Sequence, residues 1–420
     1  MSSDALGILV GGGPAPGINA VISAATMEAA RNGLRTIGIL DGYRHLVVGD
    51  ISQVVELSPE GVARIQTSGG SILRTSRTNP AKDEASLRNC VDALRRLGLR
   101  YLLAIGGDDT TFGASKIAAA TGNRLGVVTV PKTIDNDLPL PNDAPTFGFE
   151  TARAVATAVV ANLIEDARTA QRWYLVISMG RKSGSLAVGM CSSAGAALAV
   201  IPEEFGGGEL QLEPVVDTIV AAIIKRKATG YDHGVAVVAE GIAEHLSPAS
   251  LSALEGVSKD AYGHVRLADV PLGPVLRDAV RKRCSELGVA TTILTKDVGY
   301  ELRCADPIAF DVEYARSLGY GAMRYLLSGE SGALIATSHG DAVPLRLTDI
   351  VDPKTGRIRV RSVNVSSPAY KIARRYMTHL TEEDLREPQV SRLASQTNLT
   401  PANFLNEFTK LVAQPATAAS

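Results

Sequence analysis

Short apolar runs alternate along the chain with longer stretches in which apolar residues recur at helical spacing. Short runs bounded by turn residues are typical of buried strands, and the longer periodic stretches are typical of helices. The predicted strands are Ala5–Val10, Arg35–Leu40, Tyr101–Ile105, Leu125–Val130, Trp173–Met179, Gly234–Ala239 and Ala333–Thr337. The predicted helices are Ile18–Asn32, Ala85–Leu97, Thr111–Thr121, Glu150–Thr169, Ser185–Ala197, Pro214–Ala228, Val275–Leu287 and Asp311–Leu327. Because strands and helices alternate, the pattern predicts an α/β fold whose parallel sheets are covered by helices on both faces.

The turns that follow three of the predicted strands have unusual compositions. These loops are Gly11–Gly17, Gly106–Thr110 and Pro131–Asp137. In α/β folds, ligands bind at the carboxyl ends of strands, where loops lead into helix N-termini. We therefore expect all three loops on the ligand-binding edge of a sheet. Elsewhere, Pro248–Ser258 is predicted to be a loop and Gln414–Ser420 a frayed tail.

The composition is that of an ordinary soluble protein. The length of 420 residues fits two or three domains, and a hydrophobic content of 45% is enough to build large cores. The formal net charge of −1 gives no general affinity for nucleic acid or an anionic membrane. Met1–Leu6 lacks the pattern of a secretory leader, and no stretch holds the ~20 apolar residues that span a bilayer. The four cysteines form no C-x-x-C pair or zinc pattern, so we expect a reduced, cytoplasmic protein.

The first loop, Gly11–Gly17, has the sequence GGGPAPG. Glycines let the backbone approach a phosphate closely, and successive N–H groups can bind an anion. The spacing is neither that of a G-x-G-x-x-G dinucleotide loop nor that of a Walker A loop. A purely structural strand-to-helix turn is an equally good interpretation of this loop taken alone.

The second loop, Gly106–Thr110, has the sequence GGDDT and follows an apolar run. A carboxylate at a strand end suits Mg²⁺, which usually takes one or two carboxylates together with phosphate oxygens and waters. The alternative is that Asp109 or Thr110 merely caps the helix that follows.

The third loop, Pro131–Asp137, has the sequence PKTIDND, which places a cation, a hydroxyl and two carboxylates close together. Asp135 and Asp137 can point to the same side of an extended segment. One carboxylate can then accept the proton of a substrate hydroxyl while the other orients that hydroxyl or helps to hold metal. The alternative is a polar turn that is only solvated.

Taken together, the three loops resemble motifs of the phosphofructokinase family. The resemblance runs in unchanged order from about Leu6 to Tyr370. Its further motifs are Gln171-Arg172, Met179-Gly180-Arg181, Pro202-Glu203, Glu240 and Gly299-Tyr300-Glu301-Leu302-Arg303. The resemblance implies two Rossmann-like domains with parallel central sheets. Residues 1–147 plus 302–364 would bind the phosphoryl donor and Mg²⁺, 148–301 plus 365–380 would bind a sugar phosphate, and 381–420 would be a C-terminal extension.

The resemblance also implies a role for each matching residue. Asp108 corresponds to the aspartate associated with Mg²⁺, and Asp135 to the base that takes the proton from the 1-hydroxyl of fructose 6-phosphate. Thr133, Asp137 and Arg181 would position that hydroxyl and the transferring phosphoryl group. The residues implied at the donor are Gly12, Gly13, Arg77, Gly107, Asp109 and Lys132. The residues implied at the sugar phosphate are Thr133, Ile134, Asp135, Arg172, Met179, Gly180, Arg181, Glu240, Tyr300, Glu301, Leu302 and Arg303, with Arg172 lent by a neighbouring subunit.

Two positions predict the phosphoryl donor. Family members that use ATP typically carry glycine where this chain has Asp109 and Lys132, whereas members that use pyrophosphate carry an acidic residue and lysine. Asp109 would repel the α-phosphate of a nucleotide, which at ~4 Å and an effective dielectric constant of ~20 costs about 4 kcal/mol. Lys132 would supply positive charge to the smaller donor. The alternative, in which Asp109 and Lys132 only pair with each other, stays open at this point.

The sequence also departs from the simplest bacterial pattern of the family. Tyr300 stands where many ATP-using members have histidine, and Leu294 where an intersubunit arginine is often found. The resemblance still implies reversible phosphoryl transfer from pyrophosphate to fructose 6-phosphate by a homodimer or homotetramer. The alternatives are an ATP-dependent phosphofructokinase, another small-molecule kinase with a Gly-Gly-Asp loop, and a metabolite-binding protein on the same fold that catalyses no reaction.

Overall fold

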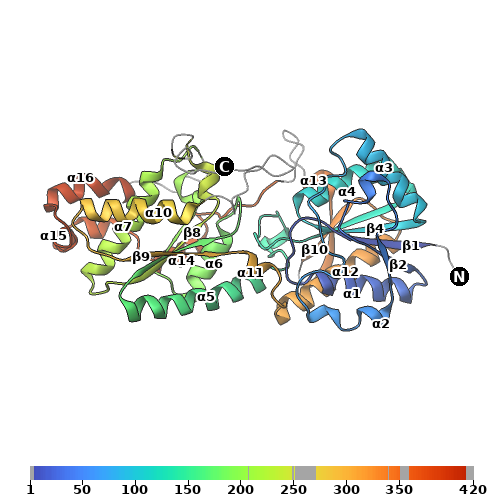
Figure 1. Cartoon of the computed structure of the whole chain (residues 1–420), viewed down its shortest axis with the longest axis horizontal. Helices are drawn as coiled ribbons and strands as arrows, with labels where there is room; N and C mark the ends of the chain where they lie inside the picture. The colour runs from blue at the N-terminus through green and yellow to red at the C-terminus, as the bar shows by residue number, and fades with distance from the viewer. Residues whose placement is uncertain are drawn as a thin grey trace. The chain divides into compact units, whose positions relative to one another are not determined.

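The chain divides into two compact units, each assembled from two separate stretches of sequence (Figure 1). The computed structural model describes residues 4–206, 208–247, 250, 271–338, 340–350 and 359–412. Unit 1 comprises Met1–Ala152 and Tyr300–Arg361, and unit 2 comprises Arg153–Gly299 and Ser362–Ser420. The predicted tail and all of the predicted loop at 248–258 except Ser250 lie outside the described residues.

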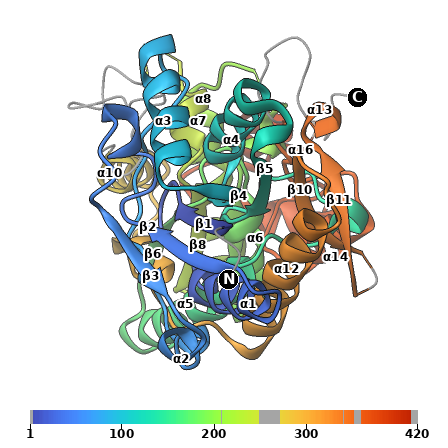
Figure 2. The same ribbon diagram turned by 90° about the vertical axis from the view of Figure 1, so that its right-hand side faces the viewer.

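Unit 1 is built on a sheet in which seven described strands run in the order β11-β10-β5-β4-β1-β2-β3 (Figure 2). The strands β10, β5, β4, β1 and β2 are parallel, whereas β11 and β3 pair antiparallel at the two edges. The central strands are continuous apolar runs because both of their faces are covered. Their bounds are β1 Ala5–Val10, β2 Arg35–Ile39, β3 Val54–Leu57, β4 Leu99–Gly106, β5 Gly126–Pro131, β10 Ala333–Ser338 and β11 Asp341–Arg346.

Helices cover both faces of this sheet. On one face, α1 (Ile18–Arg31) and α12 (Ala309–Leu327) contribute to one apolar cluster. On the other face, α3 (Glu84–Arg96) and α4 (Asp108–Thr121) contribute to a second cluster. The chain therefore leaves β1 toward one face and the adjacent β4 toward the other, which opens a crevice between the loops that follow them. The short helices of unit 1 are η1 Leu46–Val48, α2 Pro59–Val62, η2 Ile65–Thr67, η3 Gly122–Arg124, η4 Pro141–Asp143, α11 Tyr300–Arg303 and α13 Leu347–Ile350.

Unit 2 is built on a smaller sheet whose described strands are all parallel, in the order β7-β8-β6-β9. Their bounds are β6 Trp173–Ser178, β7 Leu198–Val200, β8 Gly234–Ala239 and β9 Ile293–Val298. In Figure 1, α5 (Phe149–Ala170) and α10 (Leu272–Glu286) lie on opposite faces of this sheet. The other described helices are α6 Ser185–Ala194, η5 Pro202–Phe205, α7 Leu212–Ala228, α8 Ile242–His245, α14 Pro368–Arg375, η7 Glu382–Leu385, α15 Gln389–Ala394 and α16 Pro401–Val412.

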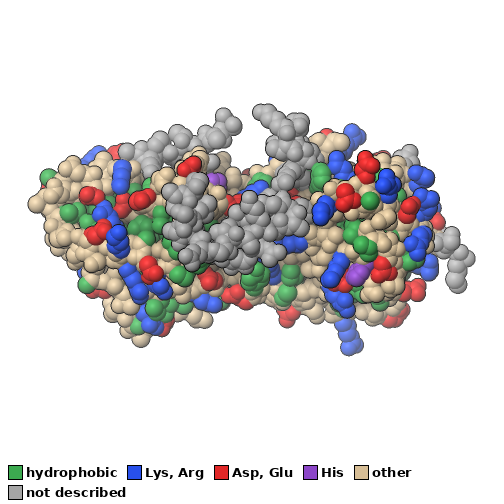
Figure 3. All heavy atoms as spheres, turned by 45° about the horizontal axis from the view of Figure 1, so that its top comes forward, with side chains coloured by type: hydrophobic (Ala, Val, Ile, Leu, Met, Phe, Trp, Pro, Cys, Tyr) green, Lys and Arg blue, Asp and Glu red, His purple; other side chains and the backbone are tan. Residues whose placement is uncertain are grey.

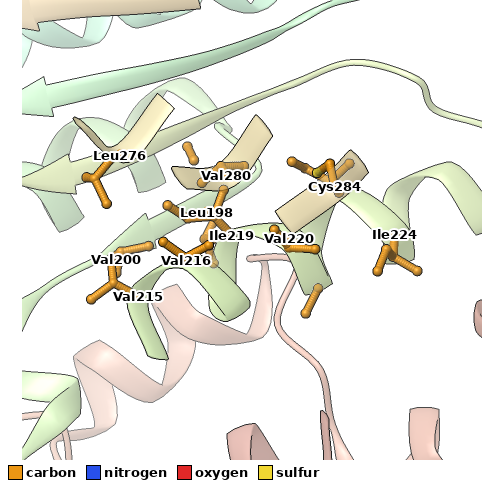
Figure 4. Packing of buried hydrophobic residues seen from close by; sticks show 14 of the residues in the cluster. Leu198, Val200, Val215, Val216, Ile219, Val220, Ile224, Leu276, Val280 and Cys284 are labelled. Atoms are coloured by element: carbon orange, nitrogen blue, oxygen red, sulfur yellow. The ribbon is translucent and has the colours of Figure 1, made fainter. Parts of the chain in front are cut away.

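The segment after residue 380 is part of the core of unit 2. Phe404 and Phe408 of α16 are 0% exposed and belong to the apolar cluster of α7 and α10. Figure 4 shows the centre of that cluster, where α7 residues face Val280 and Cys284 of α10. The buried carboxylate of Asp217 on α7 pairs with Arg283 of α10 at 3.1 Å and with Lys410 of α16 at 2.7 Å. The segment therefore completes an apolar core and its ion pairs.

The predicted α/β fold is confirmed, and every predicted strand and helix is present in the structure. The helix predicted at Ser185–Ala197 ends at Ala194, because Gly195 takes a left-handed conformation with φ 74°, and the chain then enters β7. Helix α4 begins at Asp108, three residues before its predicted start. Four strands, β3, β7, β9 and β11, were not predicted. The edge strands β3 and β11 contain exposed residues and Glu56 or Asp341, and β9 contains Lys296 and Asp297, so none of these three is a continuous apolar run.

The surface agrees with the balanced composition. On the face that Figure 3 shows, Lys and Arg side chains are interspersed with Asp and Glu side chains. This face therefore does not concentrate the positive charge that binding to nucleic acid requires. Among the described residues, none of the helices is long and apolar enough to cross a membrane.

Candidate active site

The loop after β1 is fixed in place by backbone hydrogen bonds to the strand and loop beside it. The N–H groups of Gly11 and Gly12 donate to the carbonyl oxygens of Ile105 and Ser76, at 2.9 Å each. A side chain at Gly11 would collide with Thr110, whose Oγ1 would lie 2.3 Å from the added Cβ. Gly12 has φ 81°, in the left-handed region that favours glycine. The first two glycines are therefore needed by the local structure itself, and they hold Gly13 at the carboxyl edge of the sheet.

The loop after β4 is shorter than predicted, because its two aspartates already belong to α4. Gly107 is the N-cap, and Asp108 and Asp109 occupy the first turn. The alternative in which Asp109 or Thr110 caps the helix is therefore wrong. Carboxylates in the first turn are stabilised by the positive end of the helix dipole. Both side chains are half-buried, so two negative charges are held beside the Gly13 loop at the crevice between β1 and β4.

Lys132 joins the loop after β5 to the loop after β1. Its side chain is 4% exposed, and its Nζ donates a hydrogen bond to the carbonyl oxygen of Gly13. The backbone N–H of Lys132 donates to the carbonyl oxygen of Gly106 at 2.9 Å. One residue thus contacts both glycine loops and brings a buried ammonium group to them.

The rest of the third loop is held in a defined conformation. The Thr133 hydroxyl accepts a hydrogen bond from the Asp135 N–H at 3.0 Å. Asn136 is left-handed with φ 56°, and its Oδ1 accepts from the N–H of Thr146 at 3.1 Å and from the half-buried guanidinium of Arg361. Asp135 is 9% exposed, and its Oδ1 has no hydrogen-bond partner among the described residues. The loop therefore presents a buried carboxylate oxygen that is still able to accept a proton or hydrogen bond.

Arg303 lies next to the first glycine loop. A Cβ added to Gly13 would lie 3.4 Å from the Arg303 Cζ, and the same guanidinium stacks over the Tyr300 ring at 4.9 Å. Both residues belong to α11, whose Leu302 side chain is fully buried and leaves only its backbone for a ligand contact. Glu301 is exposed on the same turn. Arg77 is exposed in the segment whose Ser76 carbonyl oxygen accepts from Gly12.

In unit 2, the carboxyl ends of β6 and β8 bring a second group of predicted residues together. Glu240, which is 8% exposed, accepts through Oε1 from the N–H groups of Gly180 and Arg181 at 3.1 Å each. Arg181 has φ 47°, a left-handed conformation that is strained for a residue other than glycine. Met179 is buried beside Gly299, where an added Cβ would lie 2.9 Å from the Met179 Cε. The buried carboxylate therefore holds the backbone that carries Arg181.

Arg172 does not join this group. It precedes β6, whereas Met179 follows β6, and six strand residues separate the two by about 20 Å. The Arg172 guanidinium pairs with Asp166 through Nε at 2.9 Å and NH2 at 2.7 Å, and Tyr174 donates to the same carboxylate at 2.6 Å. Within unit 2, therefore, Arg172 lies at the opposite end of the strand from the other predicted sugar-phosphate residues.

Comparison with known proteins identifies the family of this chain. Residues 5–326 match the family described as Phosphofructokinase. The chain is 52% identical over 392 residues, 92% of this chain and 93% of the relative, to "Pyrophosphate--fructose 6-phosphate 1-phosphotransferase" of Thermotoga maritima. The chain belongs to the phosphofructokinase family. A protein of the same name from Naegleria fowleri is 47% identical over 417 residues, 97% of this chain and 95% of the relative.

Solved phosphofructokinase structures have the same fold. The structure of phosphofructokinase from Saccharomyces cerevisiae aligns with a TM-score of 0.66 and 18% identity over 97% of this chain. The alignment covers 50% of the yeast chain, so this chain spans half the length of that relative. At this level of identity, the match shows that the chain has the phosphofructokinase fold, with two Rossmann-like units.

Two residues that support the site, Arg361 and Asp311, were missed from the sequence. Arg361 binds the third loop through the carbonyl oxygens of Asn136 and Ala144, at 3.1 and 3.0 Å. Asp311 of α12 is 0% exposed and accepts from the N–H groups of Gly148 and Thr151 at 2.7 Å each. Burial raises the pKa of the Asp311 carboxyl, and these hydrogen bonds oppose that effect. An isolated arginine or aspartate far along the chain carries no local pattern that reveals such contacts.

Glu203, which follows β7, supports the Arg181 loop in unit 2. Its Oε1 accepts from the N–H of Gly184 at 2.9 Å and from the N–H of Val363 at 3.0 Å. Burial raises the pKa of Glu203 above its ordinary value, while the backbone hydrogen bonds lower it. Two carboxylates, Glu203 and Glu240, thus hold the two ends of the loop 180–184. The family resemblance includes the Pro202-Glu203 motif but implies no role for Glu203.

Proposed function

We propose that the chain transfers a phosphoryl group reversibly from pyrophosphate to the 1-hydroxyl of fructose 6-phosphate, which yields fructose 1,6-bisphosphate and phosphate. The observation that carries the proposal is the buried Lys132 ammonium on the Gly13 carbonyl oxygen, at the sheet edge where α4 begins with two carboxylates. The names of the Thermotoga and Naegleria relatives support the same donor. Both directions are expected to run readily because the phosphoanhydride of the donor and the phosphate ester of the product are similar in energy.

In this proposal, unit 1 binds the donor. Gly12, Gly13 and Gly107 would let the phosphates approach the backbone, while Arg77 and Lys132 would supply positive charge. Phosphoryl transfer passes through a loose transition state, so catalysis depends mainly on alignment and on charge around the equatorial oxygens. A preorganised cation such as Lys132 requires little reorganisation during the reaction, because its side chain is already buried and hydrogen-bonded.

We assign the proton transfer to Asp135. The 1-hydroxyl of the sugar must lose its proton as it attacks the phosphorus, and the unpartnered, buried Oδ1 of Asp135 is available to accept it. Thr133 and Asp137 flank this carboxylate and would orient the hydroxyl, together with the backbone of Ile134. The hydrogen bond from the Asp135 N–H to the Thr133 hydroxyl fixes the base relative to the loop.

We assign binding of the sugar phosphate to Met179, Gly180, Arg181 and Glu240 of unit 2, and to Tyr300, Glu301, Leu302 and Arg303. A planar guanidinium binds a phosphate through two parallel hydrogen bonds, which suits Arg181 and Arg303. Arg172 lies at the far end of β6 from the Arg181 loop. We therefore propose that Arg172 serves a neighbouring subunit in a homodimer or homotetramer.

Magnesium fits the residues present in unit 1. Enzymes of this family generally use a divalent metal. The described residues hold no cluster of three or more potential ligands, but Mg²⁺ needs only one or two carboxylates when phosphate oxygens and waters complete its shell. Asp108 would provide that carboxylate. A bound divalent cation would also relieve the repulsion between the donor phosphates and the two aspartates in the first turn of α4.

A panel of phosphoryl donors tests this function. Purified enzyme is supplied with fructose 6-phosphate, Mg²⁺ and one of pyrophosphate, ATP or polyphosphate, and fructose 1,6-bisphosphate is measured directly. We expect turnover with pyrophosphate and almost none with ATP. Equal or better turnover with ATP would support the ATP-dependent alternative, and no turnover with any donor would support a binding protein without catalysis.

A further inference from the structure

Unit 2 contains a cavity of about 300 Å³ that none of the roles assigned above uses. It is lined by η5, α7, α14, α16 and the segments on either side of α14, all of which belong to unit 2. A volume of this size lies at the lower end of the range of small-molecule sites. The apolar part of its wall consists of Phe205, Ala221, Val365, Leu380 and Leu411.

A buried histidine with an unused hydrogen-bonding atom lines the cavity. His379 is 7% exposed, and its Nε2 has no hydrogen-bond partner among the described residues. Oε1 of Glu204 lies 3.9 Å from this nitrogen, too far for a hydrogen bond. Burial, with the nearby charges of Arg374 and Lys225, lowers the pKa of His379 to about 3, so the ring is neutral at neutral pH. Leaving a buried polar atom unpaired costs stability unless a ligand atom satisfies it.

The charges around the cavity leave one cation unused. Glu204 accepts from the Tyr370 hydroxyl at 2.6 Å and from the Arg374 guanidinium, so its negative charge is already compensated. Lys371 lies one turn before Arg374 on α14 and is exposed at the cavity. No described residue forms a hydrogen bond or ion pair with its ammonium group. The local balance of Lys371 and Arg374 against Glu204 therefore favours an anionic group, while the apolar wall favours a compact hydrocarbon body.

The cavity is linked to the Arg181 loop through two consecutive residues. Glu204 lines the cavity, whereas the preceding residue, Glu203, binds the N–H of Gly184 at the end of that loop. Both glutamates lie on η5, a single short turn, so a shift of this turn changes the position of both carboxylates. The same Glu203 oxygen binds Val363, which lies two residues before the cavity residue Val365.

We propose that this cavity binds a small organic anion with a compact apolar body, and that its occupancy is coupled to sugar-phosphate binding through η5. The anionic head group would contact Lys371 and Arg374, a polar atom of the ligand would pair with His379 Nε2, and the body would pack on Phe205 and Leu380. The proposal of a binding site does not depend on the proposed function of the protein, whereas the coupling rests on the proposed function of the Arg181 loop.

Isothermal titration calorimetry without substrates tests the binding site. The probes are phenylacetate and phenyl phosphate, which separate a carboxylate from a phosphate head group, and benzyl alcohol as the neutral control. We expect saturable binding of at least one anion and none of benzyl alcohol. Lys371→Met should weaken binding about two- to fivefold, as expected for an exposed charge. His379→Phe, which removes the nitrogen and enlarges the ring, should weaken it about tenfold or more.

Lys282→Met is the matched control, because Lys282 is an exposed lysine of the same unit that lies outside the cavity, and it should bind like the wild type. Failure of both anions to bind the wild type would overturn the site, as would equal affinities in all four proteins. The coupling is read from the KM for fructose 6-phosphate with and without the bound anion. Adding the anion should change this KM in the wild type and leave it unchanged in His379→Phe. An unchanged KM in the wild type would refute the coupling, and the calorimetry remains decisive even if the enzyme uses another substrate.

Discussion

Lys132 donates a hydrogen bond to the carbonyl oxygen of Gly13, across the strand β4 that separates their own strands in the sheet. This contact places a buried ammonium group at the glycine loop, where the family resemblance implies the donor phosphates. It also gives Lys132 two roles, since the same group supports the loop and supplies charge. Because both roles act at the glycine loop, substitutions at Lys132 should affect catalysis more than the global stability of the protein.

Replacing Lys132 is the most direct test of the donor site. Lys132→Met keeps most of the buried hydrocarbon and removes the charge, so turnover with pyrophosphate should fall about 10²–10³-fold, the loss expected for one preorganised donor. Lys116→Met, which removes an exposed lysine of α4, should leave turnover unchanged. Steady-state kinetics with pyrophosphate measure both. Turnover within threefold of the wild type in Lys132→Met would remove Lys132 from the mechanism.

Asp109 should determine whether ATP is rejected. Asp109→Gly removes a first-turn carboxylate that would repel the α-phosphate of a nucleotide, at a cost of about 4 kcal/mol when the charges are ~4 Å apart. The ratio of ATP-driven to pyrophosphate-driven turnover should therefore rise. Asp109→Asn serves as the control that removes the charge and keeps the volume. If neither variant raises the ratio, the rejection of ATP depends on other residues.

Asp135 should be required for the chemical step and much less for binding. Asp135→Asn preserves the shape of the side chain but cannot accept the hydroxyl proton, so kcat should fall about 10²–10⁴-fold with a small change in KM. Asp143→Asn, an exposed carboxylate in the following η4 turn, is the matched control. A fall of less than threefold in kcat for Asp135→Asn would mean that another group takes the proton.

Arg181 and Arg303 should contribute in different ways. Both variants, Arg181→Ala and Arg303→Ala, should raise the KM for fructose 6-phosphate. Arg181→Ala should lower kcat in addition, because we propose that Arg181 faces the phosphoryl group during transfer. Glu240→Gln keeps one oxygen that can accept from the Arg181 N–H, so it should be less damaging than Glu240→Ala. An effect of Arg181→Ala confined to KM would contradict this division.

The C-terminal helix α16 should be necessary for the stability of unit 2. Phe404 is 0% exposed, and Phe404→Ala should lower the free energy of unfolding by about 3–5 kcal/mol through lost burial and the remaining cavity. Asn406→Ala, at an exposed position of the same helix, should change it by less than about 0.5 kcal/mol. Urea denaturation measures both variants. Equal small changes would show that α16 is dispensable for the core.

The positions of the buried strands and of the three loops could be predicted from the sequence, because the pattern that reveals each of them lies within a few neighbouring residues. Buried parallel strands are continuous apolar runs, and the loops at their carboxyl ends, such as Gly106–Thr110, concentrate the polar groups. The contact between Lys132 and Gly13 could not be predicted, because it depends on the order of strands. The strands β5 and β1 lie about 10 Å apart with β4 between them. The contact forms because the lysine side chain is long enough to reach from the loop after β5 to the loop after β1.

The supporting residues were beyond sequence reasoning for a similar reason. Asp311 and Arg361 act on loops that lie more than 150 residues earlier in the chain, through contacts with backbone groups that any sequence offers. For residues 381–420 the sequence predicts only a C-terminal extension, since Phe404 and Phe408 give no indication of the surface on which they pack. Their partners are the apolar faces of α7 and α10.

Both units draw on sequence from each half of the chain, and this has a consequence for synthesis of the protein. Unit 1 needs α12, which packs against α1, and β10, which pairs with β5. A nascent chain that has emerged only as far as residue 299 therefore exposes the apolar surfaces of α1 and of one edge of β5. Such long-range pairings slow folding and prolong the time during which these surfaces are open to aggregation. Helix α16 follows every other described element of unit 2 in the chain, so the core of unit 2 can close only after this segment has been translated.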